Sequence, residues 1–234
     1  MKISIVIPVY NEEKTIERVL DEVLRASFGC EVVREVIVVD DGSTDSTPAL
    51  LKKYTDIVLV SFPKNQGKGA AVKEGFLRAT GDYLLIQDSD LEYSPDDYEV
   101  LLKPILERGA DVVFGTRFRG EYQRVLYYWH YLGNTFLTML SNMFTNLNVS
   151  DMEVGYKVFS QEVVKAIGPR LTSKRFGIEP ELTARVAYGR RGGWKIYEVP
   201  IHYNGRTYAE GKKISWRDGF KAIFAIVYFN VFDR

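Results

Sequence analysis

Short apolar runs rich in valine and isoleucine alternate with segments of helical spacing, and this alternation constrains the fold more than any other feature of the sequence. The runs predict strands near residues 3–8, 35–40, 56–61, 82–87 and 111–115. Apolar spacing and helix-start residues predict helices over about residues 12–27, from Ser46 or Thr47 onward, and after Gly67. Strands that alternate with helices form a mostly parallel sheet with helices on both faces. The sequence therefore predicts an α/β fold.

The alternation stops at Gly120, and the second half of the chain has a different character. We expect a long aromatic-rich helical stretch over residues 122–146, a helix within 179–190, a strand within 195–203 and a last helix over 214–232. The sequence shows no internal repeat and no linker of biased composition. We therefore expect one domain, residues 1–234, with halves at 1–119 and 120–234.

Composition excludes several classes of function. The 31 basic and 31 acidic residues balance, so the overall field does not favour nucleic acid, and an anion site has to be built locally. The single cysteine, Cys30, cannot form an internal disulfide, which fits a reducing, cytoplasmic location, and we expect it to be a buried small apolar residue. The first apolar run is too short for a signal peptide. The apolar residues 220–232 are too few to cross a bilayer as a helix, which takes about 20.

Two carboxylates follow the fourth predicted strand, at Asp88 and Asp90. In an extended segment their side chains point the same way, because side chains alternate with a period of two. Neighbouring carboxylates repel each other unless a cation lies between them, and oxygen ligands suit Mg²⁺ or Mn²⁺. Asp96 and Asp97 are different, because Ser94 and the proline after it form a helix start in which acids are favourable.

Two other loops at the same predicted edge of the sheet carry polar groups. Asp40 and Asp41 follow the second strand; one of them closes the loop as an Asx-turn, and the other can accept hydrogen bonds from a uracil or guanine base. Asp45 is expected to cap the following helix. Gly67 and Lys68 precede the third helix, where glycine allows close backbone approach and a helix N-terminus attracts phosphate. In open parallel sheets ligands bind beyond this edge.

These motifs, in this order, resemble the family 2 glycosyltransferases of GT-A fold, and among them the polyprenyl-phosphate (dolichyl-phosphate) sugar synthases. The resemblance spans almost the whole chain and rests on the segments "IPVYNEEKTI", "VVDDGSTDST", "NQGKGAAVKEGFLRATGDYLLIQDSD", "FGTRF", "DMEVGYKVF" and "VPIHYNGRTYAEGKKISWRDG". It implies a nucleotide-sugar-binding first half and an acceptor-binding second half. The spacing of Arg206, Glu210 and Lys212 is the part most particular to the lipid-phosphate enzymes.

Residue by residue, the resemblance implies three groups of site residues. The nucleotide part of the donor is held by Pro8, Tyr10, Glu12, Val39 and Asp41. The metal motif of the family is matched by Asp88, Ser89 and Asp90, with Glu92 as a possible third oxygen ligand. The donor diphosphate and the acceptor phosphate are bracketed by Arg117, Arg206 and Lys212, with Gly67 and Lys68 as a further phosphate-binding loop. The family arginine early in the long helical segment is missing, and Arg124 and His130 are its two possible substitutes.

The implied activity is metal-dependent, inverting transfer of a sugar from a nucleotide sugar of the GDP-mannose or UDP-glucose type to a polyprenyl phosphate. A phosphate acceptor is ionised near pH 7 and needs no strong base, whereas a saccharide or other hydroxyl acceptor needs a carboxylate, for which Asp151 and Glu153 are the candidates. A magnesium-binding receiver module is a third possibility, but such a module ends near residue 125. It would leave the Arg206 to Lys212 region unexplained.

The last predicted helix bears on the location of the protein. Its apolar residues recur at spacings of three and four and form one stripe, made of Trp216, Phe220, Ile223, Phe224, Val227 and Val231. Such a stripe suits a helix that lies in a membrane interface or against a partner protein, and it equally suits a helix that covers the core. We predict peripheral association with the cytoplasmic face of a membrane.

Overall fold

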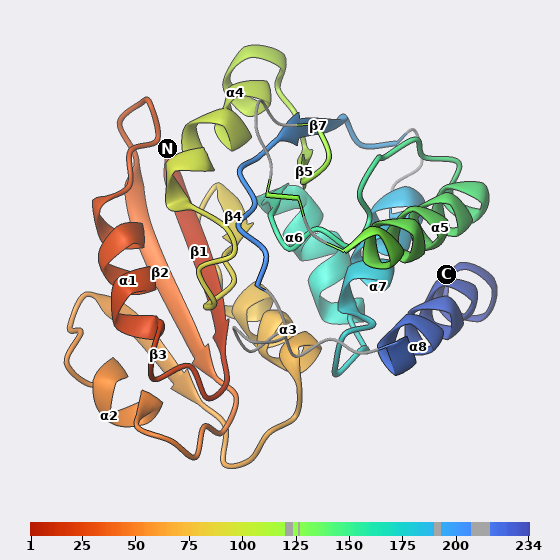
Figure 1. Cartoon of the computed structure of the whole chain (residues 1–234). Coiled ribbons are helices and arrows are strands. Elements are labelled where there is room, and N and C mark those ends of the chain that lie inside the picture. Colours follow the sequence, from red (N-terminus) through yellow and green to blue (C-terminus); the bar gives the residue numbers. More distant parts are fainter. Residues whose placement is uncertain (120–123, 126, 190–192, 207–215) are drawn as a thin grey trace.

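The structure is a computed structural model that describes residues 1–119, 124–125, 127–189, 193–206 and 216–234. Its centre is one sheet of seven strands in the order β3-β2-β1-β4-β6-β5-β7, with helices on both faces (Figure 1). The strands are β1 (Lys2–Val9), β2 (Val33–Asp40), β3 (Ile57–Ser61), β4 (Tyr83–Ile86), β5 (Val112–Thr116), β6 (Lys157–Ser160) and β7 (Ile196–Pro200). Only β6 runs antiparallel to its neighbours, β4 and β5. The sheet is thus mostly parallel, as the sequence predicts.

Eight α-helices are found among the described residues. They are α1 (Ile16–Arg25), α2 (Thr47–Leu51), α3 (Lys68–Arg78), α4 (Tyr98–Arg108), α5 (Tyr128–Thr145), α6 (Gln161–Ile167), α7 (Ile178–Tyr188) and α8 (Trp216–Val227). Short 3₁₀ turns lie at Pro95–Asp97 and Gly168–Arg170, and a π-helical turn, Tyr228–Phe232, extends α8. The predicted helices and strands are therefore present, although α1 is shorter than the apolar spacing indicates.

Each face of the sheet has its own apolar core. Alternate residues of β1 show the division, since Ile5 packs with α1 and α4 on one face and Val6 packs with α3, α6 and α7 on the other. Both residues are fully buried. A parallel strand buried on both faces reads as a continuous apolar run, which is the pattern of β1.

Helix α3 packs closely against the sheet at one glycine. A Cβ atom at Gly75 would lie 2.1 Å from the Val6 side chain, so only glycine fits there. This close packing fixes α3 against β1. The N-terminus of α3, with Lys68, is thereby held beside the carboxyl ends of the strands.

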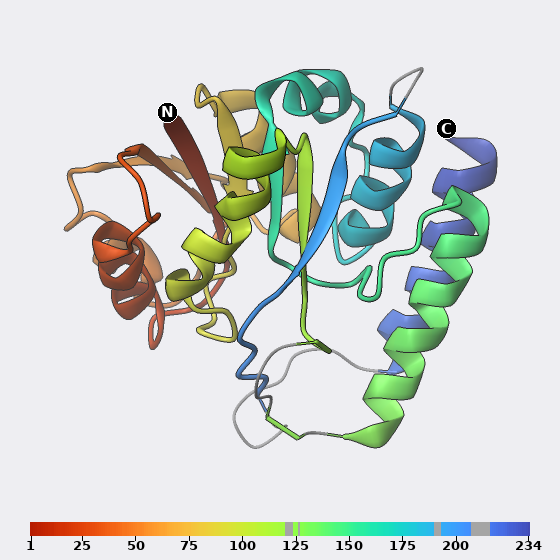
Figure 2. The same ribbon diagram turned by 90° about the horizontal axis from the view of Figure 1, so that it is seen from above.

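Helices α5 and α8 pack side by side at the far end of the molecule from α1 and α2 (Figures 1 and 2). One side of α8 is buried through Ala222, Ala225 and Ile226, while Phe220 and Phe224 on its other side are exposed. The helix therefore covers the core, as one of the two expectations has it, and it also carries exposed aromatic side chains on its outer side. Its contact with a membrane or a partner protein stays a prediction. No helix among the described residues has the length and apolar character to span a membrane.

Three features of the structure differ from the sequence-based expectation. Strand β6 and helix α6, which follows it directly, are not among the predicted elements. Cys30 is exposed rather than buried, since it lies in the loop between α1 and β2 and outside the sheet layers. The prediction of a buried apolar cysteine was wrong.

Candidate active site

The candidate site lies where β1, β2 and β4 end. These strands are parallel neighbours, so the segments that follow them, beginning at Tyr10, Asp41 and Gln87, leave the sheet at one edge. The N-terminus of α3 and the segment after β7 border the same edge through Lys68 and Arg206. The motifs that the sequence analysis singled out are therefore gathered in one place.

Asp88 is paired with a cation from the helix α3. Its Oδ1 lies 2.7 Å from Lys68 Nζ, which is also 3.2 Å from Glu179 Oε1. Glu179 in turn pairs with the fully buried Lys157. Burial alone would lower the pKa of Lys68, but the charges of Asp88 and Glu179 raise it above its usual value. The four side chains form a chain of alternating charges that keeps Lys68 protonated beside Asp88.

Asp90 is paired with a cation from a different part of the chain. Its Oδ2 accepts a hydrogen bond of 2.8 Å from Arg206 Nη2. Burial raises the pKa of Asp90 to about 7, and the nearby charges of Asp88 and Glu92 add to this rise, although Arg206 opposes it. A second positive charge beside Asp90 would therefore lower the energy of its ionised form.

Glu92 binds the segment that follows β7. Its Oε1 accepts a hydrogen bond from the backbone N–H of Arg206 at 2.9 Å, and its Oε2 accepts one from the Tyr203 hydroxyl at 2.9 Å. Both carboxylate oxygens thus have partners from within the protein. The contribution of Glu92 as a metal ligand stays a prediction.

The residues predicted to hold the nucleotide surround the end of β1. Glu12 is buried and its Oε2 accepts a hydrogen bond of 2.8 Å from the Thr15 hydroxyl, which lies 2.8 Å from the Ser89 carbonyl oxygen as well. Tyr10 is exposed at the rim. The side chain of Val39 packs in the core below α3, so only its backbone can face a ligand. Pro8 is buried and is its register partner on β1.

The two aspartates after β2 have separate roles. Asp40 Oδ1 accepts a hydrogen bond from the backbone N–H of Ser43, which closes the loop as the sequence predicts for one of the pair. The carboxylate of Asp41 accepts hydrogen bonds from Asn65 Nδ2 at 2.9 Å, and from the backbone N–H groups of Gln66 at 2.6 Å and Gly67 at 2.7 Å. Asp41 therefore shapes the loop before α3, where Gly67 has a φ of 103°. Its contact with a nucleotide stays a prediction.

Arg117 forms a fork-to-fork ion pair with Asp151. Nε lies 2.6 Å from Asp151 Oδ2 and Nη2 lies 2.7 Å from Oδ1, and Nη2 also donates to Asn134 Oδ1 at 3.0 Å. Burial alone would raise the pKa of Asp151, but the Arg117 guanidinium holds it below its usual value. Asp151 is therefore ionised and occupied, which makes it unsuited to accept a proton from a hydroxyl group.

Glu153 differs from Asp151 in having an unsatisfied oxygen. Its Oε1 is buried and has no hydrogen-bond partner among the described residues. Burial raises the pKa of Glu153 to about 7, and the charge of Glu179 contributes to the rise. A carboxyl group with this pKa can exchange a proton near neutral pH.

A polar network beneath Asp88 has no signal in the sequence motifs. The side-chain oxygen of Gln87 accepts hydrogen bonds from the hydroxyl groups of Tyr98 at 2.7 Å and Tyr156 at 2.6 Å, and its Nε2 donates to the Asp88 carbonyl at 3.0 Å. All three side chains are fully buried. The network fixes the backbone at the point where β4 leads into the acidic segment.

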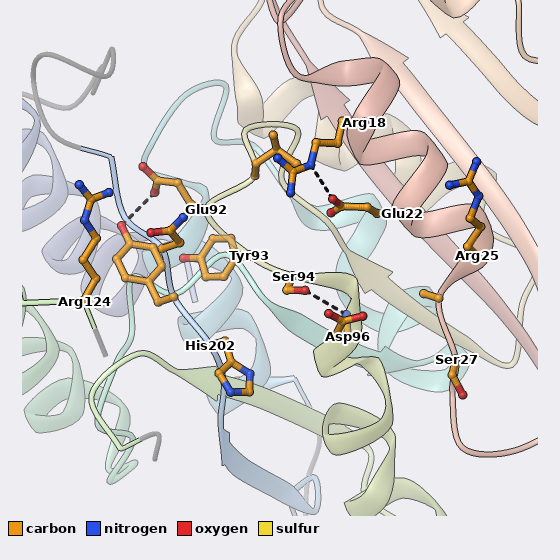
Figure 3. A pocket seen from close by; sticks show the side chains of 14 residues that line it. Arg18, Glu22, Arg25, Ser27, Glu92, Tyr93, Ser94, Asp96, Arg124 and His202 are labelled. Carbon is orange, nitrogen blue, oxygen red and sulfur yellow. Dashed lines mark hydrogen bonds and ion pairs between the residues drawn. The ribbon is translucent and has the colours of Figure 1, made fainter. Parts of the chain in front are cut away.

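Glu92 also lines a cavity of about 740 Å³ (Figure 3). Helix α1 contributes Arg18 to its lining, and the segment after β7 contributes His202 and Tyr203. Arg124 lines this cavity and donates a hydrogen bond of 3.0 Å to the Gly205 carbonyl. Of the two substitutes considered for the family arginine, Arg124 is thus near the acidic segment, whereas His130 packs against Tyr127 and is not part of the lining.

The family model for glycosyl transferase family 2 matches residues 4–168. This is well over half of the chain, and it includes both the acidic segment and the Lys68 loop. The chain belongs to glycosyl transferase family 2. It is therefore a glycosyltransferase, as the resemblance implied.

Similar proteins agree with this membership. The chain is 31% identical over 99% of its length to dolichyl-phosphate beta-glucosyltransferase ALG5A of Trichomonas vaginalis, of which it covers 74%. It is 30% identical over 94% of its length to the low-salt glycan biosynthesis hexosyltransferase Agl6 of Haloferax volcanii, of which it covers 52%. Glucosyl-3-phosphoglycerate synthase from Mycobacterium tuberculosis, solved with Mn²⁺, UDP and phosphoglyceric acid, has the same fold, with a TM-score of 0.74 and 23% identity over 98% of this chain and 78% of that one. The GT-A fold is confirmed.

The carboxylates of this glycosyltransferase suit a divalent cation in their chemistry. Asp88 and Asp90 offer hard oxygen atoms, which Mg²⁺ and Mn²⁺ prefer as ligands. In this structure each carboxylate is paired with a cation of the protein, Asp88 with Lys68 and Asp90 with Arg206. Among the described residues, no three acidic, histidine or cysteine side chains are grouped so that they could hold a metal by themselves. Mg²⁺ in proteins is commonly held by one or two carboxylates and takes its other ligands from water and substrate phosphates. Lys212, a predicted phosphate contact, lies outside the described residues.

Proposed function

We propose that this protein transfers a sugar, with inversion, from a nucleotide sugar to a polyprenyl phosphate in a reaction that depends on Mg²⁺ or Mn²⁺. The observation that carries the proposal is the convergence of Arg206 on Asp90, Glu92 and Glu12 at the strand ends. Arg206 belongs to the motif that most resembles the lipid-phosphate enzymes. A relative named as a dolichyl-phosphate beta-glucosyltransferase supports the same acceptor class and favours glucose as the transferred sugar.

The donor would lie across the ends of β1, β2 and β4. Tyr10, Glu12 and the loop shaped by Asp41 would contact the nucleoside, and Lys68 at the N-terminus of α3 would contact the diphosphate as a point charge. Asp88 and Asp90 would hold the cation. When bound, this cation would neutralise the negative charge that develops on the departing diphosphate.

The acceptor would supply its own nucleophile. A phosphate monoester is ionised near pH 7, so its oxygen needs orientation rather than deprotonation. Arg206 presents its guanidinium at the acidic segment, and Arg124 lines the adjoining cavity, so we assign both to the acceptor phosphate, together with Lys212. Arginine forks suit the oxygens of a phosphate group in geometry and charge.

A lipid acceptor also fits the outer face of α5 and α8. Helix α5 contains no Asp, Glu, Lys or Arg in 18 residues, and Trp129 and Phe136 on it are exposed, as is Phe224 on α8. Aromatic residues on an uncharged helical face suit the boundary between head groups and acyl chains. We propose peripheral binding of this face, named here the α5–α8 face, to the cytoplasmic side of a membrane.

The activity can be tested with a panel of donors. UDP-glucose, GDP-mannose and their epimers would be incubated with polyprenyl phosphate and either Mn²⁺ or Mg²⁺, and lipid-linked sugar would be detected by mass spectrometry. We expect product with one donor, and loss of product when EDTA removes the metal. Absence of lipid-linked product with every donor would contradict the proposed acceptor.

A variant links the activity to the site. Asp90→Ala is expected to abolish transfer and to leave the fold intact, because Asp90 lies after β4 and outside both apolar cores. Asp96→Ala is the matched control, since Asp96 belongs to the helix start and its backbone N–H bonds Ser94. Retained activity in Asp90→Ala would remove this residue from the metal site.

A hydroxyl acceptor is the second candidate, favoured by one observation. Glu153 has an unpaired buried oxygen and a pKa of about 7, which suits a base that deprotonates a hydroxyl group. Asp151 does not fit that role, because Arg117 occupies its carboxylate. If the hydroxyl acceptor is correct, Glu153→Gln will lose most of the transfer activity; with a phosphate acceptor the same variant will keep most of it.

A further inference from the structure

Arg206 is a shared counter-ion for three carboxylates that come from two loops. Its Nη2 lies 2.8 Å from Asp90 Oδ2 and 3.9 Å from Glu12 Oε1, and its Nε lies 3.4 Å from Glu92 Oε1. Asp90 and Glu92 follow β4, and Glu12 follows β1. The guanidinium therefore occupies the centre of the negative charge at which the proposed function places a divalent cation.

The backbone that carries Arg206 is held independently of its side chain. Glu92 accepts a hydrogen bond from the backbone N–H of Arg206 at 2.9 Å, and its own carbonyl oxygen accepts one from Asn204 N–H at 2.9 Å. Tyr203 bonds the same carboxylate through its hydroxyl and pairs with Tyr93 through a β-bridge. The Arg206 side chain can therefore leave Asp90 while its backbone stays in place.

We propose that Arg206 and the divalent cation are alternative partners of Asp90, and that this exchange couples metal binding to donor binding. The inference rests on the proposed function. A guanidinium and a divalent cation at one carboxylate repel each other, so metal binding requires Arg206 to give up a charge-assisted hydrogen bond. Metal alone then binds weakly. A donor diphosphate offers the released guanidinium a new anionic partner, so metal and nucleotide strengthen each other's binding.

The exchange also orders the acceptor half of the site. Without metal, the Arg206 fork is engaged with Asp90 and Glu92, so it is withheld from any phosphate. Once metal and donor are in place, the fork no longer pairs with Asp90, and its five N–H donors can contact oxygens of the donor diphosphate and of the acceptor phosphate together. The acceptor phosphate thus meets its arginine only in a site that already holds the donor.

The test measures Mn²⁺ binding directly, by the electron paramagnetic resonance signal of free Mn²⁺, with no nucleotide and no acceptor. Arg206→Gln removes the competing charge, and we expect it to bind Mn²⁺ about tenfold more tightly than the unaltered protein. Arg206→Met is a second neutral variant of similar length, so the result does not depend on the behaviour of one substitution. Arg18→Gln is the matched control, because it removes the same charge from an arginine that pairs with Glu22 on α1. We expect it to change the affinity by less than about twofold.

A second titration measures the coupling. UDP, and in parallel GDP, is expected to increase the Mn²⁺ affinity of the unaltered protein, and this increase is expected to be about tenfold smaller in Arg206→Gln, since no competing cation remains to be released. In the Asp90→Asn background, Arg206→Gln is expected to give no gain in Mn²⁺ affinity, because the shared partner is gone.

The outcomes separate this inference from the function on which it rests. Unchanged or weaker Mn²⁺ binding by both neutral Arg206 variants, while the unaltered protein binds Mn²⁺ with UDP or GDP, overturns the exchange and leaves the proposed function standing. A gain that persists in the Asp90→Asn background shows a general charge effect and also overturns it. Absence of Mn²⁺ binding in the presence of both nucleotides overturns the exchange and the metal dependence together.

Discussion

Gly155 lies so close to Asp88 that a Cβ atom on Gly155 would be 2.3 Å from Asp88 Oδ2. A carbon atom and an oxygen atom that are not bonded to each other do not approach this closely, so a side chain at residue 155 would displace the Asp88 carboxylate. The backbone N–H of Gly155 also donates to the Tyr93 hydroxyl at 3.0 Å, which limits how far residue 155 can retreat. This glycine therefore determines where one of the two proposed metal ligands lies.

Gly155→Ala is accordingly expected to lower kcat/KM for sugar transfer on the order of 100-fold, since small displacements of site groups have effects of this size. The measurement is initial-rate kinetics with saturating metal. Gly133→Ala is the matched control: Gly133 is exposed on α5 and no heavy atom lies within 4 Å of a Cβ built there. It is expected to keep full activity and to gain roughly 0.5–1 kcal/mol in the free energy of unfolding. Equal activity in the two variants would contradict the argument.

Breaking the ion pair between Arg117 and Asp151 is expected to destabilise the protein. Asp151 is fully buried, and Arg117 is nearly so, so Asp151→Ala leaves a guanidinium without its carboxylate in the interior. We expect the free energy of unfolding to fall by about 3 kcal/mol or more, measured by urea denaturation. Glu22→Ala breaks the exposed Arg18–Glu22 pair and is expected to cost less than about 0.5 kcal/mol. Similar losses of unfolding free energy in both variants would show that burial does not determine how much an ion pair contributes to stability.

Sequence reasoning predicted six of the seven strands, the mostly parallel sheet and the location of the acidic segment, because these depend on local patterns of apolar and polar residues. It predicted that Asp88 and Asp90 point the same way, on the assumption that the segment is extended. In the structure β4 ends at Ile86 and the chain bends from Ser89 onward, so the segment is not extended. The two carboxylates consequently pair with cations from different regions, Lys68 and Arg206.

The contacts that organise the site could not be read from the sequence. Glu92 and Tyr203 are 111 residues apart, and Lys157 and Glu179 are 22 apart on different elements. No spacing rule joins such residues, since the path of the chain between them decides whether they meet. The ion pair between Arg117 and Asp151 is a further example, because the sequence motifs assigned these two residues to separate roles.

Glu153 predicts a dependence of stability on pH. Its pKa is raised to about 7 in the folded protein, whereas an unfolded chain has a value near 4.5, so the folded state binds the proton more tightly. Stability from this group is therefore fully present below about pH 4.5 and is lost as the pH rises to about 7. Glu153→Gln removes this loss. The variant is expected to be more stable than the unaltered protein at pH 8 by on the order of 1–3 kcal/mol, with a smaller difference at pH 5.

The comparison requires urea denaturation of both proteins at the two pH values, because the unaltered protein has other groups, such as Asp90, with a raised pKa. Only the difference between the two proteins reports on Glu153. A stability difference that is the same at pH 5 and pH 8 would contradict the raised pKa.

The α5–α8 face predicts binding to lipid. Trp129 is 76% exposed and Phe224 is 71% exposed, and the helices that carry them pack side by side (Figure 2). The free energy falls when large apolar side chains leave water and enter the boundary region of a bilayer. The double variant Trp129→Ser with Phe224→Ser is expected to bind vesicles of neutral and anionic phospholipid at least about tenfold more weakly in a sedimentation assay. Val33→Ser, which removes an apolar side chain that is 63% exposed at the start of β2, is expected to bind like the unaltered protein. If the unaltered protein stays in the supernatant at low salt, the face does not bind lipid; if all three proteins sediment equally, another surface does.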